Sequence, residues 1–234
     1  MTYNVNGMQL STKREKVFNY VKEKISTGMC FFQECHSTPD SEKEWKKCWN
    51  GQIYFSHGQS NSTGCAIAFS ENLDIKIDAD KISRDEKGRI LILEATYDSK
   101  KLLLINLYNA NTEKDQLEIL SNLCNLLSNH NPDGDFHAIF SGDFNVIFDT
   151  VLDAAGGNPS LKKKSLAKII SITESLDTCD AFRIRHPNSK RFTFRRKNPS
   201  LQRRLDYIFL SNNFQEYISI RLKSDIWRTF HNSH

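Results

Sequence analysis

The 234-residue sequence lacks the features that mark zinc-bound, disulfide-linked or membrane-spanning proteins. Its six cysteines form no CxxC pair and no zinc-type spacing, which predicts reduced thiols in a nuclear or cytosolic protein. No apolar run approaches the length of a membrane-spanning helix, and no signal peptide opens the chain. The sequence also shows no repeat, low-complexity stretch or linker. We therefore expect a single domain over residues 1–234 with no membrane association.

Acidic residues are missing from one long stretch, although the whole chain is nearly balanced at a formal charge of +4. Residues 183–204 contain nine lysines and arginines, no Asp and no Glu, with Phe192 and Phe194 between them. Solvated surface runs usually mix both signs of charge, whereas an all-basic run with aromatics suits a nucleic-acid backbone. A solvated face is the alternative interpretation.

The most informative stretch is Ser-Gly-Asp-Phe-Asn at residues 141–145. The apolar residues 138–140 lead into it, which predicts a short buried strand that ends in a glycine turn. Asp143 could take a proton from water, and Asn145 could hold that water or a substrate oxygen. A Gly-Asp turn can also serve only to cap a loop. The functional interpretation therefore depends on similar polar residues after other strands.

Polar side chains do follow other predicted strands. A carboxylate at the tip of a buried strand needs either a lysine partner or a cation, and hard divalent cations prefer such oxygens. Asparagine and tyrosine at a strand end could hold a phosphate oxygen or could only shape the turn. The residues are Asn4 and Asn6 in the turn of residues 2–7, Glu34 after residues 29–33, and Tyr108 and Asn111 after residues 101–107.

The remaining pattern predicts helices alternating with short strands. Helices are expected over residues 12–26, 41–49, 113–129 and 160–175, and short strands with antiparallel pairing over 52–55, 64–69, 74–79, 89–97 and 101–107. A further apolar strand has Asp206 near its start and runs to Leu210. Thr12 and Glu15 have the spacing of a capping box. Leu117, Leu120, Cys124 and Leu127 predict the buried stripe of their helix. Residues 162–164 are three lysines, which indicate either an exposed face or contact with an anion.

In order along the chain, Asn-Val-Asn-Gly, Gln-Glu, Tyr-x-x-Asn, Gly-Asp-Phe-Asn and Arg-Leu-Asp-Tyr resemble the motifs of the exonuclease–endonuclease–phosphatase superfamily. Within it, the chain looks most like the apurinic-type endonuclease domain of LINE-type (non-LTR) retrotransposons. That likeness is carried by residues 180–183, 186–187 and 191–194, and by Asp153 followed by Gly156-Gly157. The resemblance covers nearly the whole chain. It implies an α/β fold, a four-layer sandwich of two mostly antiparallel sheets packed face to face with helices outside.

The resemblance also implies a Mg²⁺-dependent endonuclease that leaves a DNA nick with a 3′-hydroxyl, which primes reverse transcription. Glu34 would hold the ion, assisted by Asn6, and Mn²⁺ could replace Mg²⁺. Asp143 would orient and deprotonate water, while Asn145, Asn4 and Tyr108 would bind the scissile phosphate. Asp206 would orient His234, which would contact the phosphate. The implied substrate-binding residues are Asn111, Arg191, Thr193, Arg195, Arg196, Arg203 and Arg204, with residues 192–203 as a hairpin that enters a groove.

The end of the chain departs from the family pattern. Asn232-Ser233-His234 stands where Ser-Asp-His is expected, Ser224-Asp225 comes earlier without a histidine, and the family's final strand is missing. With the abrupt start, this predicts a domain clipped at both ends.

The resemblance implies that the partner is double-stranded DNA and that the protein is a monomer. It also implies a nuclear location, or a cytoplasmic one before import, and a full-length parent that carries a reverse transcriptase domain. Three other functions remain open. They are an apurinic-site repair endonuclease, a phosphatase of lipids or inositol phosphates, and a degenerate copy that binds DNA without catalysis.

Overall fold

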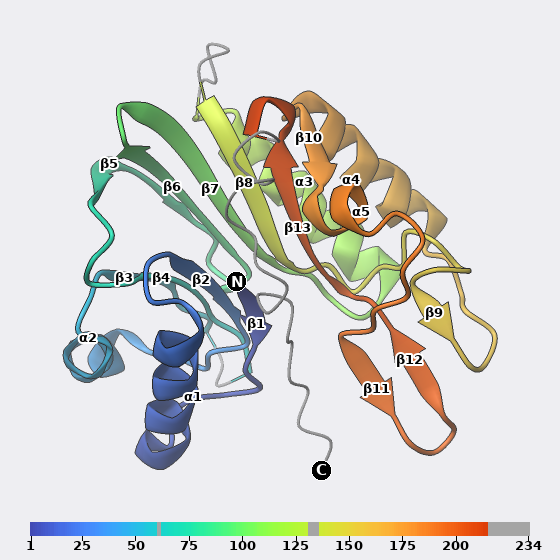
Figure 1. The fold of residues 1–234 in the computed structure, drawn as a ribbon, viewed down its shortest axis with the longest axis horizontal. Helices are drawn as coiled ribbons and strands as arrows, with labels where there is room; N and C mark the ends of the chain where they lie inside the picture. Colours follow the sequence, from blue (N-terminus) through green and yellow to red (C-terminus); the bar gives the residue numbers. More distant parts are fainter. Residues whose placement is uncertain (60–61, 131–135, 215–234) are drawn as a thin grey trace.

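The computed structural model describes residues 1–59, 62–130 and 136–214, and it confirms the expected α/β sandwich (Figure 1). Helices α1 (Ser11–Lys24) and α2 (Glu42–Trp49) pack on the outer face of a four-stranded sheet. Helices α3 (Glu113–Leu127) and α4 (Lys163–Ser175) pack on the outer face of a six-stranded sheet. A third apolar cluster joins the inner faces of the two sheets.

The four-stranded sheet has the order β1-β2-β4-β3. Its strands are β1 (Thr2–Asn4), β2 (Met29–Gln33), β3 (Ile53–Ser56) and β4 (Cys65–Phe69). The pair β1–β2 is parallel, with Asn4 opposite Gln33, and the other pairs are antiparallel. Because parallel strands end at the same edge of a sheet, Asn4 and Glu34 emerge close together.

The six-stranded sheet has the order β10-β13-β8-β7-β6-β5. Only β7–β8 is parallel, so the expected mostly antiparallel pairing is confirmed. The strand predicted over 74–79 continues to residue 84 through an irregularity in its pairing. The strands are β5 (Ile75–Arg84), β6 (Ile90–Tyr97), β7 (Lys100–Tyr108), β8 (Phe136–Asp143), β10 (Thr178–Asp180) and β13 (Asp206–Ser211).

The central strands are buried on both faces. Along β2, Phe32 packs toward the helices α1 and α2, while Phe31 packs toward the other sheet. Along β7, Leu103 packs toward α3 and α4, while Leu104 packs between the sheets. Strands of this kind read as continuous apolar runs because successive side chains enter two different apolar layers. Each such side chain contributes about 1.5–3 kcal/mol when it leaves water.

A polar contact crosses the apolar layer between the sheets. The Nε2 of Gln33 donates to the Oδ1 of Asn106 at 2.7 Å, and the Nδ2 of Asn106 donates to the carbonyls of Phe32 and Ala66 at 2.9 Å each. Both side chains are fully buried. Since buried amides are costly unless they are paired, this contact favours one register of the two sheets over its alternatives.

A small third sheet lies beside the sandwich (Figure 1). Strands β11 (Phe194–Arg196) and β12 (Leu201–Arg203) form the hairpin that the family resemblance implied at residues 192–203. Strand β12 also pairs with β9 (Ala154–Ala155). The other short elements are α5 (Ala181–Arg185) and the 3₁₀ turns η1 (Pro39–Ser41) and η2 (Asn212–Phe214).

Two local predictions about helices were wrong. Helix α1 begins at Ser11 after an N-cap at Leu10 with no side-chain cap, so Thr12 lies inside the first turn and makes no capping box with Glu15. In α3, Cys124 is exposed, and the buried positions include Gln116 and Leu123. The polar side chain of Gln116 can occupy a buried position because its amide donates to two loop carbonyls. None of the helices in the described residues is long and apolar enough to cross a membrane.

Candidate active site

Three polar residues lie side by side where strands β7, β8 and β13 meet. Asp143 is the last residue of β8, and it stands opposite Tyr108, the last residue of β7, and Asp206, the first residue of β13. Residues opposite each other on neighbouring strands project from the same face of a sheet. The strand directions therefore bring together residues that are far apart in sequence.

The carboxylate of Asp143 is held by two amide donors. The Nδ2 of Asn4 donates to Oδ2 at 3.0 Å, and the backbone N–H of Asn145 donates to Oδ1 at 3.0 Å. Asp143 is 4% exposed and Asn4 is 8% exposed. Since Asn4 belongs to the opposite sheet, the contact joins the two sheets at this end of the sandwich. It leaves the carboxylate with one fixed orientation.

The turn that carries Asp143 requires its particular residues. Gly142 has a φ of +148°, and a Cβ there would lie 1.9 Å from the carbonyl oxygen of Leu107, so only glycine fits. Asn145 has a φ of +50°, a conformation that asparagine tolerates better than most residues. Between them, Phe144 is fully buried among aromatic rings that include Phe140 and Tyr207. The packing of Phe144 in the core therefore holds the turn in place.

Glu34 and Tyr108 complete the acidic side of the site. Glu34 follows β2 with a φ of +56°, and its carboxylate lies 3.8 Å from Nε2 of His36. Burial raises the pKa of the Tyr108 phenol, and the neighbouring carboxylates of Glu34 and Asp143 raise it further. The phenol therefore stays protonated at neutral pH. It can donate a hydrogen bond to an anionic ligand.

An open pocket of about 870 Å³ lies over this arrangement. It brings together most of the residues that the sequence singled out. The predicted residues on its wall are Asn4, Asn6, Glu34, Tyr108, Asn111, Asp143, Asn145, Arg195 and Arg203.

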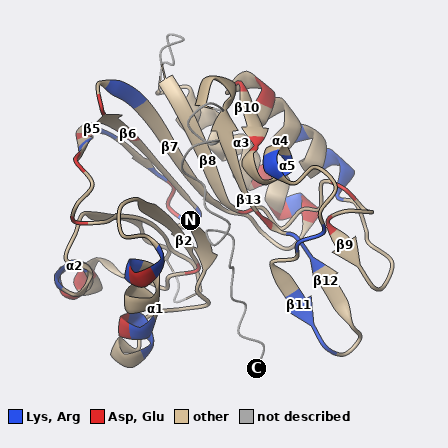
Figure 2. Cartoon of the chain, viewed as in Figure 1, with Lys and Arg blue, Asp and Glu red and all other residues tan. Residues whose placement is uncertain are grey.

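Sequence reasoning missed two cations on the wall of this pocket. Lys13 and Lys16 of α1 border it on the side opposite the β11–β12 hairpin, and the Nζ of Lys13 donates to the carbonyl of Asn6 at 2.7 Å. Figure 2 shows Lys and Arg on both elements. The amphipathic pattern of residues 12–26 placed lysines on the polar face of a helix. It could not show that this face borders the site.

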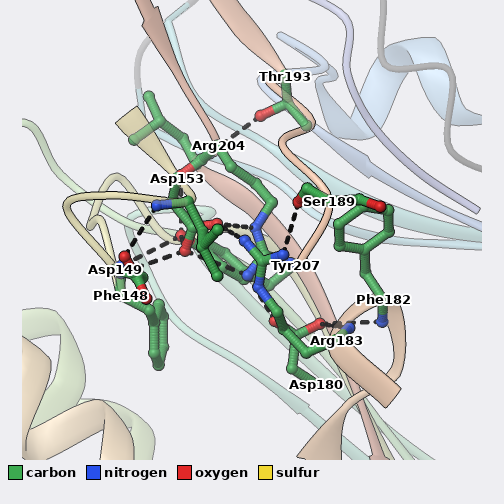
Figure 3. Close-up of polar contacts among 12 residues, drawn as sticks. Phe148, Asp149, Asp153, Asp180, Phe182, Arg183, Ser189, Thr193, Arg204 and Tyr207 are labelled. Carbon is green, nitrogen blue, oxygen red and sulfur yellow. Dashed lines mark hydrogen bonds and ion pairs between the residues drawn. The ribbon is translucent and has the colours of Figure 1, made fainter. Parts of the chain in front are cut away.

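One predicted DNA contact is wrong. Arg204 is 3% exposed and lies inside an ion-pair network (Figure 3). Its Nε donates to Asp153 at 2.7 Å, one terminal nitrogen donates to Asp180 at 2.6 Å, and its guanidinium stacks over Tyr207. A buried arginine with two carboxylate partners cannot reach a DNA backbone. The basic stretch 183–204 thus contains structural cations as well as exposed ones.

Other predicted residues have mixed positions. The Oγ1 of Thr193 accepts the backbone N–H groups of Leu205 at 3.0 Å and Asp206 at 3.2 Å, and neither Thr193 nor Asp206 lines the pocket. Arg203 borders the pocket but donates to the carbonyls of Ala155 and Gly156. Arg191 is half-buried before β11, whereas Arg195 and Arg196 are exposed on β11. Ser224, Asp225, Ser233 and His234 lie outside the described residues.

The pocket offers only hard oxygen donors to a metal ion. The described residues contain no cluster of three or more His, Cys, Asp and Glu side chains that could hold a metal. Glu34 and the amide oxygen of Asn6, the two predicted metal ligands, both border the pocket and could hold a cation there. Mg²⁺ fits such a sparse donor set because it keeps several water ligands and binds through one or two carboxylates.

Residues 1–220 match the Endonuclease/Exonuclease/phosphatase family, and the chain belongs to that family. Over 216 residues it is 26% identical to the Transposon TX1 uncharacterized 149 kDa protein of Xenopus laevis. That match covers 91% of this chain and 16% of the relative, so the chain spans about a sixth of the relative's length.

Solved structures of apurinic (AP) endonucleases share the fold. The enzyme LMAP from Leishmania major has a TM-score of 0.72 at 17% identity, covering 92% of this chain and 79% of that one. The Xenopus laevis APE2 catalytic domain has a TM-score of 0.66 at 16% identity, covering 92% and 82%. An AP endonuclease from Archaeoglobus fulgidus has a TM-score of 0.66 at 21% identity, covering 92% and 87%.

Proposed function

We propose that this chain is a Mg²⁺-dependent endonuclease that cuts one strand of double-stranded DNA and leaves a 3′-hydroxyl. The observation that carries the proposal is the setting of Asp143. Its carboxylate borders the pocket, stands in register with Tyr108, and is oriented by amides from both sheets. That is the arrangement expected of a general base with phosphate-binding donors beside it.

The residues around Asp143 supply the remaining chemistry. Asp143 accepts a proton from the attacking water, and the side chains of Asn145, Asn4 and Tyr108 donate hydrogen bonds to the phosphate oxygens. Mg²⁺ held by Glu34 and Asn6 would neutralise charge on the phosphate and on the departing 3′ oxygen. Asn111 borders the same pocket and supports the phosphate-binding side. Asp206 orients His234 in this scheme.

The charge around the pocket supports a nucleic-acid substrate. Lys13 and Lys16 of α1 lie on one side, and Arg195 and Arg203 of the hairpin lie on the other. Cations on both sides of an acidic centre suit a polyanion whose backbone passes over it. Arg196 and Lys197 extend the exposed charge along the hairpin. We propose that this hairpin enters a groove of the duplex.

The transposon relative supports a role in target-site nicking. Because the chain matches 16% of a 149 kDa protein, we propose that it is one domain of a longer element protein that also carries a reverse transcriptase. The 3′-hydroxyl at the nick would then prime DNA synthesis. In this proposal the domain spans residues 1–234 and acts as a monomer in the nucleus.

The test is nicking of supercoiled plasmid DNA with Mg²⁺, with Mn²⁺ and with EDTA. We expect relaxed circles with either ion, none with EDTA, and none from Asp143→Ala or Glu34→Ala. Glu71→Ala, at an exposed turn remote in sequence from these motifs, is the matched control and should nick like the wild type. Extension of the nick by a DNA polymerase would establish the 3′-hydroxyl.

A second candidate, repair of apurinic sites, is favoured by the fold of the AP endonucleases. Duplex oligonucleotides with and without a single apurinic site separate the two functions. Cleavage of intact DNA at a comparable rate supports target-site nicking, whereas cleavage confined to the apurinic site supports repair. Salt-sensitive DNA binding without any cleavage would instead identify a degenerate copy and overturn the catalytic proposal.

A further inference from the structure

The lysine run at residues 162–164 is divided by the fold. Lys163 and Lys164 are exposed, as the solvated-face interpretation expects. Lys162 is partly buried, and its Nζ donates to the carbonyl oxygen of Asn145 at 2.7 Å. No anion is needed to explain that contact. The contact connects the start of α4 to the turn that presents Asp143 and Asn145.

The same carbonyl has a second donor. The Nε2 of Gln116, on α3, reaches the Asn145 carbonyl at 3.1 Å and the Ala110 carbonyl at 2.7 Å. The Nδ2 of Asn145 itself donates to the carbonyl of Asn109 at 2.9 Å. Asn145 is thus held through both its backbone and its side chain. Since its φ is +50°, these contacts stabilise a conformation that the residue adopts less readily on its own.

Helices α3 and α4 are joined in a way that fixes Lys162. The Oε1 of Glu113, in the first turn of α3, accepts the backbone N–H groups of Lys164 at 2.8 Å and Ser165 at 3.4 Å. A carboxylate at this position satisfies donors that the first turn of α4 leaves unpaired and complements the helix dipole. Ser165 is fully buried. The start of α4, and with it Lys162, therefore has a defined position relative to the turn.

The charge of Lys162 also acts on the site. Burial lowers the pKa of Lys162, and the carboxylates of Asp143 and Glu113 oppose that shift. The ammonium is thus close enough to Asp143 for their charges to interact. Lys162 is not one of the residues that line the pocket, and its ammonium donates to the Asn145 carbonyl. This placement favours a role within the protein over a contact to the substrate backbone.

We propose that Lys162 is a positioning residue, which fixes the Asn145 carbonyl and so holds the turn from Gly142 to Asn145 in its active geometry. Its effect on nicking rests on the proposed function, whereas its effect on the turn does not. Removal of this hydrogen bond should lower kcat because Asp143 and Asn145 lose their alignment. DNA affinity should change little because the ammonium donates to the Asn145 carbonyl and Lys162 does not line the pocket.

The variant Lys162→Met removes the charge and the donor but keeps the length of the side chain. Lys163→Met, one residue on and exposed, is the matched control, and Lys162→Arg keeps a cation and a donor. In plasmid nicking we expect Lys162→Met to lower kcat by about tenfold or more, the scale of a small misalignment, with KM within twofold of the wild type. Lys163→Met should leave kcat unchanged. Lys162→Arg should recover most of it.

Amide hydrogen exchange provides a readout that does not need activity. We expect faster exchange over residues 142–147 in Lys162→Met than in Lys163→Met. The strands β6 and β7 should exchange at the same rate in both variants. This difference should appear whether or not the wild type nicks DNA. A failure of the proposed function would instead be seen in the nicking assay, as equal rates for the wild type and Asp143→Ala. Equal exchange in the two methionine variants would overturn the proposal. So would a rise in KM with a weaker salt dependence of DNA binding, which would make Lys162 a phosphate ligand.

Discussion

Asp143 and Asp206 stand opposite each other in the register of strands β8 and β13, yet only Asp143 borders the pocket. The two residues make different hydrogen bonds. Asp143 accepts from the side chain of Asn4 and the backbone of Asn145, whereas the backbone N–H of Asp206 is held by the hydroxyl of Thr193. Adjacent carboxylates in different settings can take different chemical roles.

The first prediction separates these two carboxylates. Asp143→Asn should lower the single-turnover nicking rate by about 10²–10⁴-fold, because the amide keeps the shape but cannot accept the proton. Asp206→Asn should lower the rate less, since that residue acts through another group. DNA binding by both variants should stay near that of the wild type in a fluorescence anisotropy titration. An Asp143→Asn rate within twofold of the wild type would exclude Asp143 as the general base.

The second prediction concerns the basic stretch, whose arginines serve two purposes. Arg195→Gln and Arg196→Gln should weaken DNA binding, and each should reduce the slope of log K against log salt by about one, because one fewer phosphate is neutralised. Their melting temperatures should match the wild type because both side chains are exposed.

Arg204→Gln is the contrasting variant. It removes the guanidinium that binds both Asp153 and Asp180. Breaking a buried ion pair costs about 3–5 kcal/mol. Urea unfolding should therefore show a large drop in stability. A stable Arg204→Gln protein with weakened DNA binding would restore Arg204 as a DNA contact.

The third prediction tests the contact between the two sheets. Asn106→Leu should lower the free energy of unfolding by about 1–3 kcal/mol, because the buried Nε2 of Gln33 loses its 2.7 Å acceptor. The double variant with Gln33→Leu should recover part of that stability, since removing both partners leaves fewer unsatisfied groups. Asn125→Leu, on the exposed side of α3, is the control. Urea unfolding compares the wild type with Asn106→Leu, the double variant and Asn125→Leu. A double variant less stable than Asn106→Leu would contradict the prediction.

The fourth prediction is a loss of stability in alkali. Burial raises the pKa of the Cys30 thiol to about 12 and the pKa values of the Cys35 and Cys65 thiols well above their usual range. A raised folded-state pKa means that the stabilisation is complete below the unfolded value near 9 and is lost as pH rises toward the folded value. Each thiol should therefore cost about 1.4 kcal/mol per pH unit in that window.

Urea unfolding at pH 7, 9 and 10.5 measures this effect. Cys65→Ala should show a shallower decline than the wild type, while Cys124→Ser, at an exposed position, should show the same decline. At pH 8, a thiol reagent should react quickly with Cys124 and slowly with the three buried cysteines. An equal decline in the two variants would assign the alkaline destabilisation to other groups, such as the buried tyrosines.

The sequence could predict elements whose local pattern decides them. The apolar strands of both sheets follow from runs of residues and turn chemistry that act within a few positions, whereas the hairpin at 192–203 was implied by the family resemblance. The Gly-Asp-Phe-Asn turn is also local, because Gly142 and Asn145 occupy backbone conformations that favour those residue types. The start of α1 was misplaced because its N-cap is Leu10, which has no side-chain acceptor, so the Thr12–Glu15 spacing does not mark the first residue of the helix.

Other features depend on partners that are distant in sequence. Nothing in the local sequence near residue 204 indicates that its guanidinium meets Asp153 and Asp180, and the composition of residues 183–204 favoured exposure for every arginine there. Lys162 likewise belonged to a run of three similar residues, and only the docking of α4 on α3 separates it from the other two.

By itself, the sequence determined the order of strands and helices, the family, and the polar residues at the strand ends, because these follow from local hydrophobic patterns and short motifs. The tertiary structure decided which residues face one another. The register of β7, β8 and β13 places Tyr108, Asp143 and Asp206 in a row, and the approach of the opposite sheet brings in Asn4. Burial also decided which cations are structural, since a charge that leaves water needs partners that only the folded chain supplies.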